Sequence, residues 1–346
     1  MSAAADSTRP PSTGPAAHPH EIVLTLANGT VACRALHVLA ELGVADHIGD
    51  NAIDVTTLAS ACDASKDGLD RALRLVADFG IFERLPHGRY RHTDASRLLR
   101  SDQPGSLRAF CRMQGLPALQ AAYSHLDHAV RTGSPAFHLV DERGLFPYLS
   151  DHPDEADIFG QAMTAKAAAD IAATLGACDF GRFKTIADIG GGHGHLLRAV
   201  LDAAPAAEGI LFELPGVVAE LQFDSSRITA HAGDFFTDPL PKADAYILMD
   251  VIHDWPDAEA IAILRAIRQA APAEARVLII ENVLTEDQPD PRGHALDIIM
   301  LAVTGGRERT ISQFAELLRT AGFSRTAVID TAGPLRIVEA VAAQEP

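Results

Sequence analysis

Thr185-Ile-Ala-Asp-Ile-Gly-Gly-Gly-His-Gly-His-Leu-Leu197 is the stretch of sequence that decides the fold. Ile186, Ala187 and Ile189 predict a short buried strand that carries an acid, Asp188, and the glycines after it predict a turn that opens a helix. Glycine allows a positive φ and lets backbone N–H groups approach a ligand. Because a helix N-terminus also favours polar or negative groups, the stretch indicates a site for a nucleotide-like ligand.

The spacing of these glycines argues against a dinucleotide. The fingerprint G-x-G-x-x-G requires a third glycine three residues after the second. Counted from Gly190 and Gly192 that position is His195, and counted from Gly192 and Gly194 it is Leu197. An acid just before G-x-G-x-G fits better with a ligand that carries an amine or a sulfonium near the loop. Taken alone, the glycines also allow a purely structural turn.

Length and composition predict a soluble globular protein with room for two domains. The chain has 346 residues, 47% of them hydrophobic, and its formal net charge of −17 disfavours nucleic acid and anionic membranes as partners. Four widely spaced cysteines without a C-x-x-C pair suit reduced thiols in a cytoplasm and predict no metal site. No stretch predicts a secretory signal or a membrane span, and residues 1–20 predict a disordered tail.

Residues 21–103 predict a mainly helical domain. Its first part, residues 21–48, has more apolar faces than one small core needs, which indicates either dimerisation or burial within the chain. Its second part has a helix–turn–helix followed by a hairpin, the pattern of a winged helix. These elements are expected at residues 55–62, 66–79, 80–85 and 89–93.

The winged helix can be interpreted in two ways. Lys66, Arg71 and Arg74 would allow the helix at 66–79 to bind DNA. Acidic residues share that helix, however, and the whole chain is strongly negative, which favours a scaffold without nucleic-acid binding.

Residues 104–174 predict a helical linker whose bulky apolar side chains contribute to a pocket, and residues 175–346 alternate strands with helices. This alternation predicts a doubly wound parallel α/β sheet, and a short link at 331–334 predicts an antiparallel hairpin at its end. Strands are expected at 185–189, 209–213, 228–231, 243–249, 276–281, 326–330 and 335–340, and helices between them at 194–203, 217–221 and 257–271.

Polar and aromatic residues follow the predicted strands, where parallel sheets bind ligands. Glu213 closes the second strand, and a carboxylate there can accept hydrogen bonds from both hydroxyls of a ribose; a helix cap is the alternative. Asp234 and Phe235 follow the third strand and suit the edge and face of an adenine, although Phe235 can equally belong to the core.

A histidine follows the fourth strand. With an ordinary pKa of about 6.5, His253 is a workable general base at neutral pH, and a cap or surface histidine is the alternative. Glu281 at the end of the fifth strand and Glu308 before a helix could fix the imidazole tautomer and stabilise the imidazolium. Because no G-x-S-x-G elbow accompanies this histidine, hydrolysis fits poorly. The histidine pairs at 193/195 and 125/128 have no partner cluster that would indicate a metal.

Together these motifs resemble the S-adenosylmethionine-dependent small-molecule O-methyltransferases, such as the plant caffeate enzymes, acetylserotonin methyltransferase and bacterial natural-product tailoring enzymes. The resemblance runs from about Glu21 to the end of the chain. It is carried by the motifs Asp188 to Gly194, Phe212 to Pro215, Gly233 to Phe236, His253 to Trp255 and Gly305 to Thr310. It implies a Rossmann-like methyltransferase domain with a seven-stranded sheet whose last strand is antiparallel, and an N-terminal winged-helix domain that forms a homodimer.

The resemblance also implies roles for individual residues. His253 would remove the proton of the acceptor hydroxyl, flanked by Glu281 and Glu308. Residues implied to hold S-adenosylmethionine are Asp188, Gly190, Gly192, Glu213, Asp234, Phe235, Asp250 and Trp255. Residues implied to line the acceptor pocket are Phe146, Phe159, Met163, Asp297 and Met300. The expected acceptor is a small aromatic molecule of a phenolic, quinone or polyketide-like kind.

The chain departs from the family at two places. Glu213 stands where the family often has Asp, and Met249 and Asp250 stand where many members have Lys or Arg before the catalytic histidine, so one cofactor contact is in question. A few bacterial relatives bind the cofactor but hydroxylate or decarboxylate. Such a relative, a winged-helix regulator and a nicotinamide enzyme are the alternatives to methyl transfer.

Overall fold

The computed structural model describes residues 18–221, 225–286 and 288–343. Most of the predicted tail, residues 1–17, lies outside this range, and its last residues begin a helix. The chain divides into two compact units, residues 1–101 and 102–346. In the part of the chain that the structure describes, no single helix has the length and apolar composition to cross a membrane, although the bent pair α1 and α2 passes that test of length and composition together.

The N-terminal unit contains the predicted winged helix. Its elements are α1 (Pro19–Ala27), α2 (Gly29–Glu41), the 3-10 turn η1 (Val44–His47), β1 (Ile53–Asp54), α3 (Val55–Ala61), α4 (Lys66–Asp78), β2 (Phe82–Leu85), β3 (Arg89–His92) and α5 (Asp94–Arg97). The three strands form one antiparallel sheet in the order β1-β3-β2. On α4, Arg71 pairs with Asp67 and Arg74 pairs with Asp70, so the two arginines of the DNA-binding interpretation are neutralised by acids of the same helix.

Helices open the second unit. They are α6 (Arg108–Met113), α7 (Pro117–Ser124), α8 (Leu126–Thr132), η2 (Ala136–Leu139), α9 (Leu145–Asp151) and the long α10 (Pro153–Ala177). Their apolar side chains share one buried cluster with α14 (Pro291–Val303), a helix from the far end of the chain. This cluster contains Phe159, Met163 and Ile299, so α10 and α14 together form an apolar wall.

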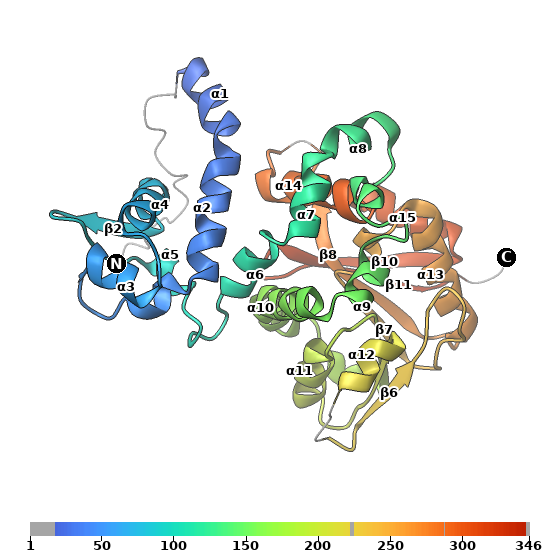
Figure 1. Cartoon of the computed structure of the whole chain (residues 1–346). Coiled ribbons are helices and arrows are strands. Elements are labelled where there is room, and N and C mark those ends of the chain that lie inside the picture. The colour runs from blue at the N-terminus through green and yellow to red at the C-terminus, as the bar shows by residue number, and fades with distance from the viewer. Residues whose placement is uncertain (1–17, 222–224, 287, 344–346) are drawn as a thin grey trace, which may run out of the picture. The chain divides into compact units, whose positions relative to one another are not determined.

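The predicted sheet is confirmed (Figure 1). Its strands are β4 (Thr185–Ile189), β5 (Glu208–Glu213), β6 (Ile228–Ala232), β7 (Ala245–Met249), β8 (Arg276–Leu284), β10 (Phe323–Asp330) and β11 (Leu335–Ala342), in the order β10-β11-β8-β7-β4-β5-β6. All neighbours from β8 to β6 are parallel, and β11 runs antiparallel to both β8 and β10. The short β9 (Arg309–Thr310) pairs with the end of β8 outside this path.

Helices cover both faces of this sheet. Side chains of α13 (Asp257–Ala270) and α15 (Ile311–Thr320) pack on one face, and those of α10 and α11 (His195–Ala203) pack on the other. The remaining short elements are η3 (Phe180–Arg182), α12 (Pro215–Glu220) and η4 (Ile252–Asp254). β4, β7 and β8 are buried on both faces, which explains the nearly unbroken apolar runs that predicted them.

Several strand ends differ from the prediction by two or three residues, and the end of β8 is the one that bears on the site. The sequence places the end of β8 at Glu281, whereas the strand continues to Leu284. The extension is held by two partners, since Asn282 pairs with Leu335 of β11 and Val283 pairs with Arg309 of β9. Both partners come from later in the chain, and local periodicity therefore could not show them. Glu281 lies inside the strand as a result.

Gly306 allows two loops to meet at the carboxyl edge of the sheet. A Cβ on this residue would overlap the carbonyl oxygen of His253 and the backbone of Asp254, neither of which can move aside independently. The next residue, Arg307, donates its N–H to the same His253 carbonyl at 2.8 Å.

Gly306→Ala should therefore lower the free energy of unfolding by about 3 kcal/mol, the upper range for an overpacked site. Gly176→Ala is the matched control, because the space around this helical glycine is open and alanine favours helix by up to about 1 kcal/mol. Urea unfolding of both variants tests this difference. Equal stability of the two would contradict the close approach at residue 306.

Candidate active site

His253 lies on η4, directly after β7, and only 4% of it is exposed. Its Nδ1 is 2.8 Å from Oε1 of Glu308, a buried residue of the loop between α14 and β9. The N–H of Glu308 in turn donates to Oδ1 of Asp297 on α14 at 2.9 Å. When Nδ1–H donates to the carboxylate, Nε2 is the ring nitrogen that can accept a proton. The arrangement can therefore act as a general base with an oriented imidazole.

Glu281 contacts the backbone of the His253 loop, whereas Glu308 contacts the imidazole ring. Its Oε1 accepts hydrogen bonds from three consecutive backbone N–H groups, those of Val251 at 3.2 Å, Ile252 at 2.6 Å and His253 at 3.1 Å. The carboxylate thus fixes the backbone that presents the histidine, and Glu308 fixes the ring. Among the described residues, Oε2 of Glu281 and Oε2 of Glu308 are buried without a hydrogen-bond partner.

Negative charge dominates the surroundings of the imidazole. Burial lowers the pKa of His253, but the hydrogen bond with Glu308 and the charges of Asp254, Asp250 and Glu281 outweigh it and raise the pKa to about 10. Burial also raises the pKa of Glu281 to about 7 and that of Asp254 to about 6, in spite of the nearby imidazolium. Without a ligand, the centre therefore favours protonated groups.

Three residues of this centre were missed as site residues by the sequence reasoning. Asp254 has Oδ1 3.9 Å from Nε2 of His253. Arg309 is completely buried, and its guanidinium donates to the carbonyls of Ile252 and Trp255 and to Asp257. Asp254 and Arg309 lie within motifs that the sequence reasoning used. The third, Lys166 of α10, had no sequence signal, because it is a single lysine far along the chain from the strand end it contacts.

The glycine loop is shaped around Asp188. Gly190, Gly192 and Gly194 all have positive φ, and a Cβ on Gly191 would overlap the Asp188 carboxylate. Burial, reinforced by the charge of Glu213, raises the pKa of Asp188 to about 7. In the part of the chain that is described, its Oδ2 has no hydrogen-bond partner.

Glu213 lies beside this loop at the end of β5. Its Oε1 accepts the N–H of Gly192 at 3.1 Å, and its Oε2 accepts that of Leu214 at 2.6 Å. Two acids at one loop repel a phosphate and favour a cationic or hydroxyl-bearing ligand. His193 of the loop packs against Gly160 of α10, 3.2 Å from where a Cβ would lie.

Aromatic side chains form the next part of the edge. Phe235 lies against Gly190, and both Phe235 and Phe236 meet the ring of Trp255 edge to face, with centroids 5.8 and 4.7 Å away. Phe146, predicted for the acceptor pocket, stacks on Trp255 at 6.1 Å and so joins the residues predicted for the cofactor. Asp234 adjoins this aromatic group through the backbone, since its Oδ1 accepts the N–H of Phe236 at 2.9 Å.

The other residues predicted for the acceptor lie on α10 and α14. Phe159 and Met163 pack in the apolar wall defined above, and Met300 of α14 is buried. Asp297 is occupied in orienting Glu308. Among the described residues no group of three or more His, Cys, Asp or Glu side chains has the arrangement of a metal site.

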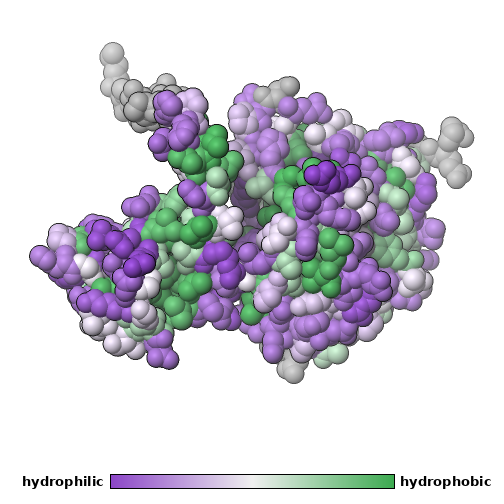
Figure 2. Space-filling view, turned by 45° about the horizontal axis from the view of Figure 1, so that its top comes forward, coloured by the Kyte–Doolittle hydropathy of each residue, from purple (hydrophilic) through white to green (hydrophobic). Residues whose placement is uncertain are grey.

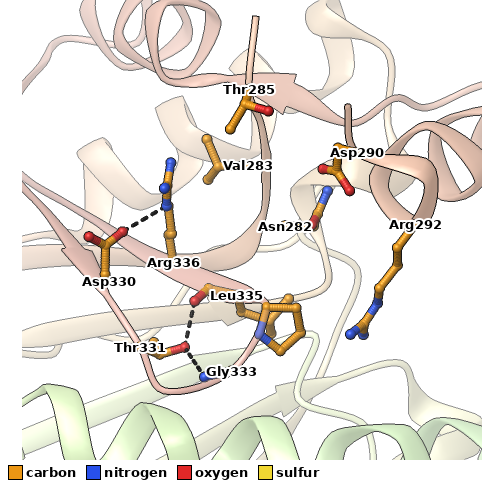
Figure 3. A pocket seen from close by; sticks show the side chains of 11 residues that line it. Asn282, Val283, Thr285, Asp290, Arg292, Asp330, Thr331, Gly333, Leu335 and Arg336 are labelled. Carbon is orange, nitrogen blue, oxygen red and sulfur yellow. Dashed lines mark hydrogen bonds and ion pairs between the residues drawn. The ribbon is translucent and has the colours of Figure 1, made fainter. Parts of the chain in front are cut away.

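A cavity of about 370 Å³ lies apart from His253 and the glycine loop, where the end of β8, the β10–β11 turn and the start of α14 meet. Figure 3 shows Arg336 paired with Asp330 on one side of it and Arg292 on the other. Its lining contains none of the predicted site residues.

Comparison with known proteins matches both units. Residues 24–102 match the O-methyltransferase dimerisation domain, and residues 123–324 match the O-methyltransferase domain. The O-demethylpuromycin-O-methyltransferase of Streptomyces alboniger is 36% identical over 92% of this chain and 88% of its own length. The phenazine O-methyltransferase of Lysobacter antibioticus is 37% identical over 92% of this chain and 95% of its own length. The 8-amino-8-demethylriboflavin N,N-dimethyltransferase of Streptomyces davaonensis is 37% identical over 83% of this chain and 85% of its own length.

Solved structures give the same result. Human N-acetylserotonin methyltransferase, in complex with S-adenosylmethionine, superposes with a TM-score of 0.86 at 28% identity, over 96% of this chain and 100% of that chain. NcsB1, an O-methyltransferase from neocarzinostatin biosynthesis, was solved with S-adenosylmethionine and 2-hydroxy-5-methyl naphthoic acid. It superposes with a TM-score of 0.76 at 32% identity, over 90% and 95% of the two chains.

The charged centre predicts how stability depends on pH. The pKa values of His253, Glu281, Asp254 and Asp188 are all raised on folding, so the folded protein binds more protons than the unfolded chain above about pH 4. Stability is then greatest at the acidic end and is lost as pH rises through the raised values. The melting temperature of the ligand-free protein should fall from about pH 5 to about pH 9, and Glu281→Gln should make that fall less steep. A melting temperature that rises over this interval would contradict the assignment.

Proposed function

The chain belongs to the family of S-adenosylmethionine-dependent O-methyltransferases, and on this premise we propose that it transfers the methyl group of S-adenosylmethionine to a hydroxyl of a small aromatic acceptor, with His253 as the general base. The observation that carries this proposal is the buried hydrogen bond between His253 and Glu308, which leaves Nε2 as the proton acceptor. A phenolic hydroxyl must lose its proton to become a strong nucleophile, so an oriented base favours oxygen as the atom methylated.

Residues at the glycine loop fit the cofactor. The unpartnered Oδ2 of Asp188, in the described part of the chain, suits a cationic amine, and Glu213 at the next strand end suits ribose hydroxyls. The edge-to-face contact of Phe235 with Trp255, and Asp234 beside them, support a purine at this edge of the sheet. When bound, S-adenosylmethionine supplies a methyl group on a positively charged sulfur that is already activated for transfer.

The base must be neutral to accept a proton, and the ligand-free pKa of His253 lies at about 10. The positive charge of a bound S-adenosylmethionine lowers the pKa of His253, because the imidazolium and the cationic ligand repel each other. Glu308 then stabilises the imidazolium that forms as the hydroxyl loses its proton. Phe159, Met163 and Met300 supply an apolar wall suited to a flat ring.

His253→Ala should lower turnover by about two to four orders of magnitude, because a positioned base contributes that much, while cofactor binding stays nearly unchanged. His294→Ala, at an exposed position of α14, is the control. Turnover is measured with the acceptor in excess, and binding of S-adenosylmethionine by calorimetry. Full activity of the His253 variant would remove the histidine from this role.

Glu213→Ala should weaken cofactor binding about tenfold to a hundredfold, the range for lost hydrogen bonds to a charged group. Glu220→Ala, at an exposed site on the neighbouring α12, should leave it unchanged. Calorimetric titration with S-adenosylhomocysteine measures both. Equal affinities would show that Glu213 does not contact the cofactor.

The dimerisation domain supports a homodimer formed through α1 and α2. No residue of α1 is buried, and apolar side chains are exposed along both helices, including Val23 at 68% and Leu26 at 81%. Figure 2 shows apolar patches on the surface of the N-terminal unit. Exposed apolar area of this kind marks a surface that another protein covers.

Charges placed on this surface should separate the subunits. Val23→Glu with Leu26→Glu should convert a dimer to a monomer in sedimentation velocity, because charges are costly to bury. Val130→Glu, at an equally exposed apolar position of α8, should not. A double variant that sediments as the unchanged dimer would contradict an interface on α1.

A further inference from the structure

Lys166 connects α10 to the strand end that carries His253. It is the only Lys or Arg in α10, a helix described along its whole length, and its Nζ lies 2.8 Å from Oδ2 of Asp250. The two residues are 84 positions apart in the chain, and their side chains are only 16% and 17% exposed. Lys166 follows Met163 by three residues, so α10 carries it next to the predicted acceptor wall.

Asp250 is the first residue after β7 and has a positive φ of 53°. A residue other than glycine in this conformation costs on the order of 1 kcal/mol or more and persists only where its surroundings hold it. Its N–H donates to the Ile280 carbonyl, and the next three N–H groups donate to Glu281. The bend at Asp250 therefore sets the path of η4 and the position of His253.

Charges face His253 from every element around it. Carboxylates approach from β7, η4, β8 and the loop before β9, and they belong to Asp250, Asp254, Glu281 and Glu308. On the cationic side, Arg309 is engaged with the carbonyls of Ile252 and Trp255 and with Asp257. The charge of Arg292 on α14 also lowers the pKa of Asp250 and that of Asp170 on α10. Among the described residues, Lys166 is the Lys or Arg whose side chain forms an ion pair with one of these four carboxylates.

The charge states of the pair agree with this geometry. Burial favours a neutral Asp250, but Lys166 and then His253 lower the pKa of this carboxyl below its ordinary value. Burial likewise favours a neutral Lys166, and Asp250 outweighs it and raises the pKa of the ammonium group. Both members are therefore ionised, and the pair adds no net charge beside the imidazole.

We propose that Lys166 is a positioning residue for His253: its ammonium group holds the bend at Asp250 that presents the imidazole, and it offsets the negative charge that Asp250 alone would place there. The inference rests on the proposed role of His253 as the base. It also accounts for the departure at residues 249 and 250, because α10 supplies a cation to a strand end that has none of its own.

A cycle of charge-changing variants tests the proposal. Lys166→Met leaves Asp250 as an uncompensated anion, so the pKa of His253 should rise and the acidic limb of the kcat/KM pH profile should move to higher pH. Asp250→Asn leaves Lys166 as an uncompensated cation, so the pKa of His253 should fall and the acidic limb should move to lower pH. Asparagine also tolerates the positive φ of residue 250. Each shift should be on the order of one pH unit. In the double variant the pKa of His253 should return close to its wild-type value, and in Lys166→Arg it should stay there.

The readout that does not depend on catalysis is the NMR titration of the His253 ring in the ligand-free protein, with the resonance identified by its absence in His253→Gln. Opposite shifts in the two single variants and their cancellation in the double variant support the proposal. Shifts in the same direction, or an unchanged His253 pKa in Lys166→Met, overturn it. NMR shifts of the expected signs without matching movement of the kcat/KM limb would instead contradict His253 as the base.

Discussion

The structure of the site depends on the 2.8 Å hydrogen bond between Nδ1 of His253 and Glu308. Its two partners come from loops 55 residues apart, and both loops have to be fixed for the bond to form. Glu281 binds three N–H groups on the histidine side, and Asp297 binds the N–H of Glu308 on the other. Gly306 lets the loops touch, and the buried Arg309 ties them together through backbone carbonyls. The imidazole is thus oriented by contacts that reach it from β8, α14 and β9.

Acidic side chains are concentrated at the carboxyl edge of the sheet to an extent that folding alone would not favour. Burying a carboxylate without a full set of partners costs stability, and four here each have an oxygen without a hydrogen-bond partner among the described residues, namely Asp188, Asp250, Glu281 and Glu308. Such oxygens are suited to a ligand that brings positive charge and hydroxyl donors. This agrees with S-adenosylmethionine as cofactor and with an edge that repels phosphate. The cost in stability and the affinity for a cation therefore have the same physical origin.

The strands of the main sheet and the residues at their carboxyl ends could be predicted from sequence, because local patterns determine both. The alternation of apolar runs with helices predicted all seven strands of the main sheet. The sequence also placed Asp188 and Glu213 at the ends of β4 and β5, and Asp234 and His253 just after β6 and β7, where the structure has them. Pairings between distant segments could not be predicted. The extension of β8 depends on β9 and β11, the stacking of Phe146 on Trp255 depends on where α9 packs, and the contact of Lys166 with Asp250 spans 84 residues. Local periodicity contains no information about such partners.

The most direct test of the central claim is mass spectrometry of the products formed from S-adenosylmethionine labelled on its methyl group, with a mixture of phenolic, quinone-derived and polyketide-like acceptors. We expect an acceptor that gains one labelled methyl group on a hydroxyl oxygen, with one S-adenosylhomocysteine formed for each methyl group transferred. Label on nitrogen, or an acceptor that is hydroxylated or decarboxylated without gaining label, would contradict it.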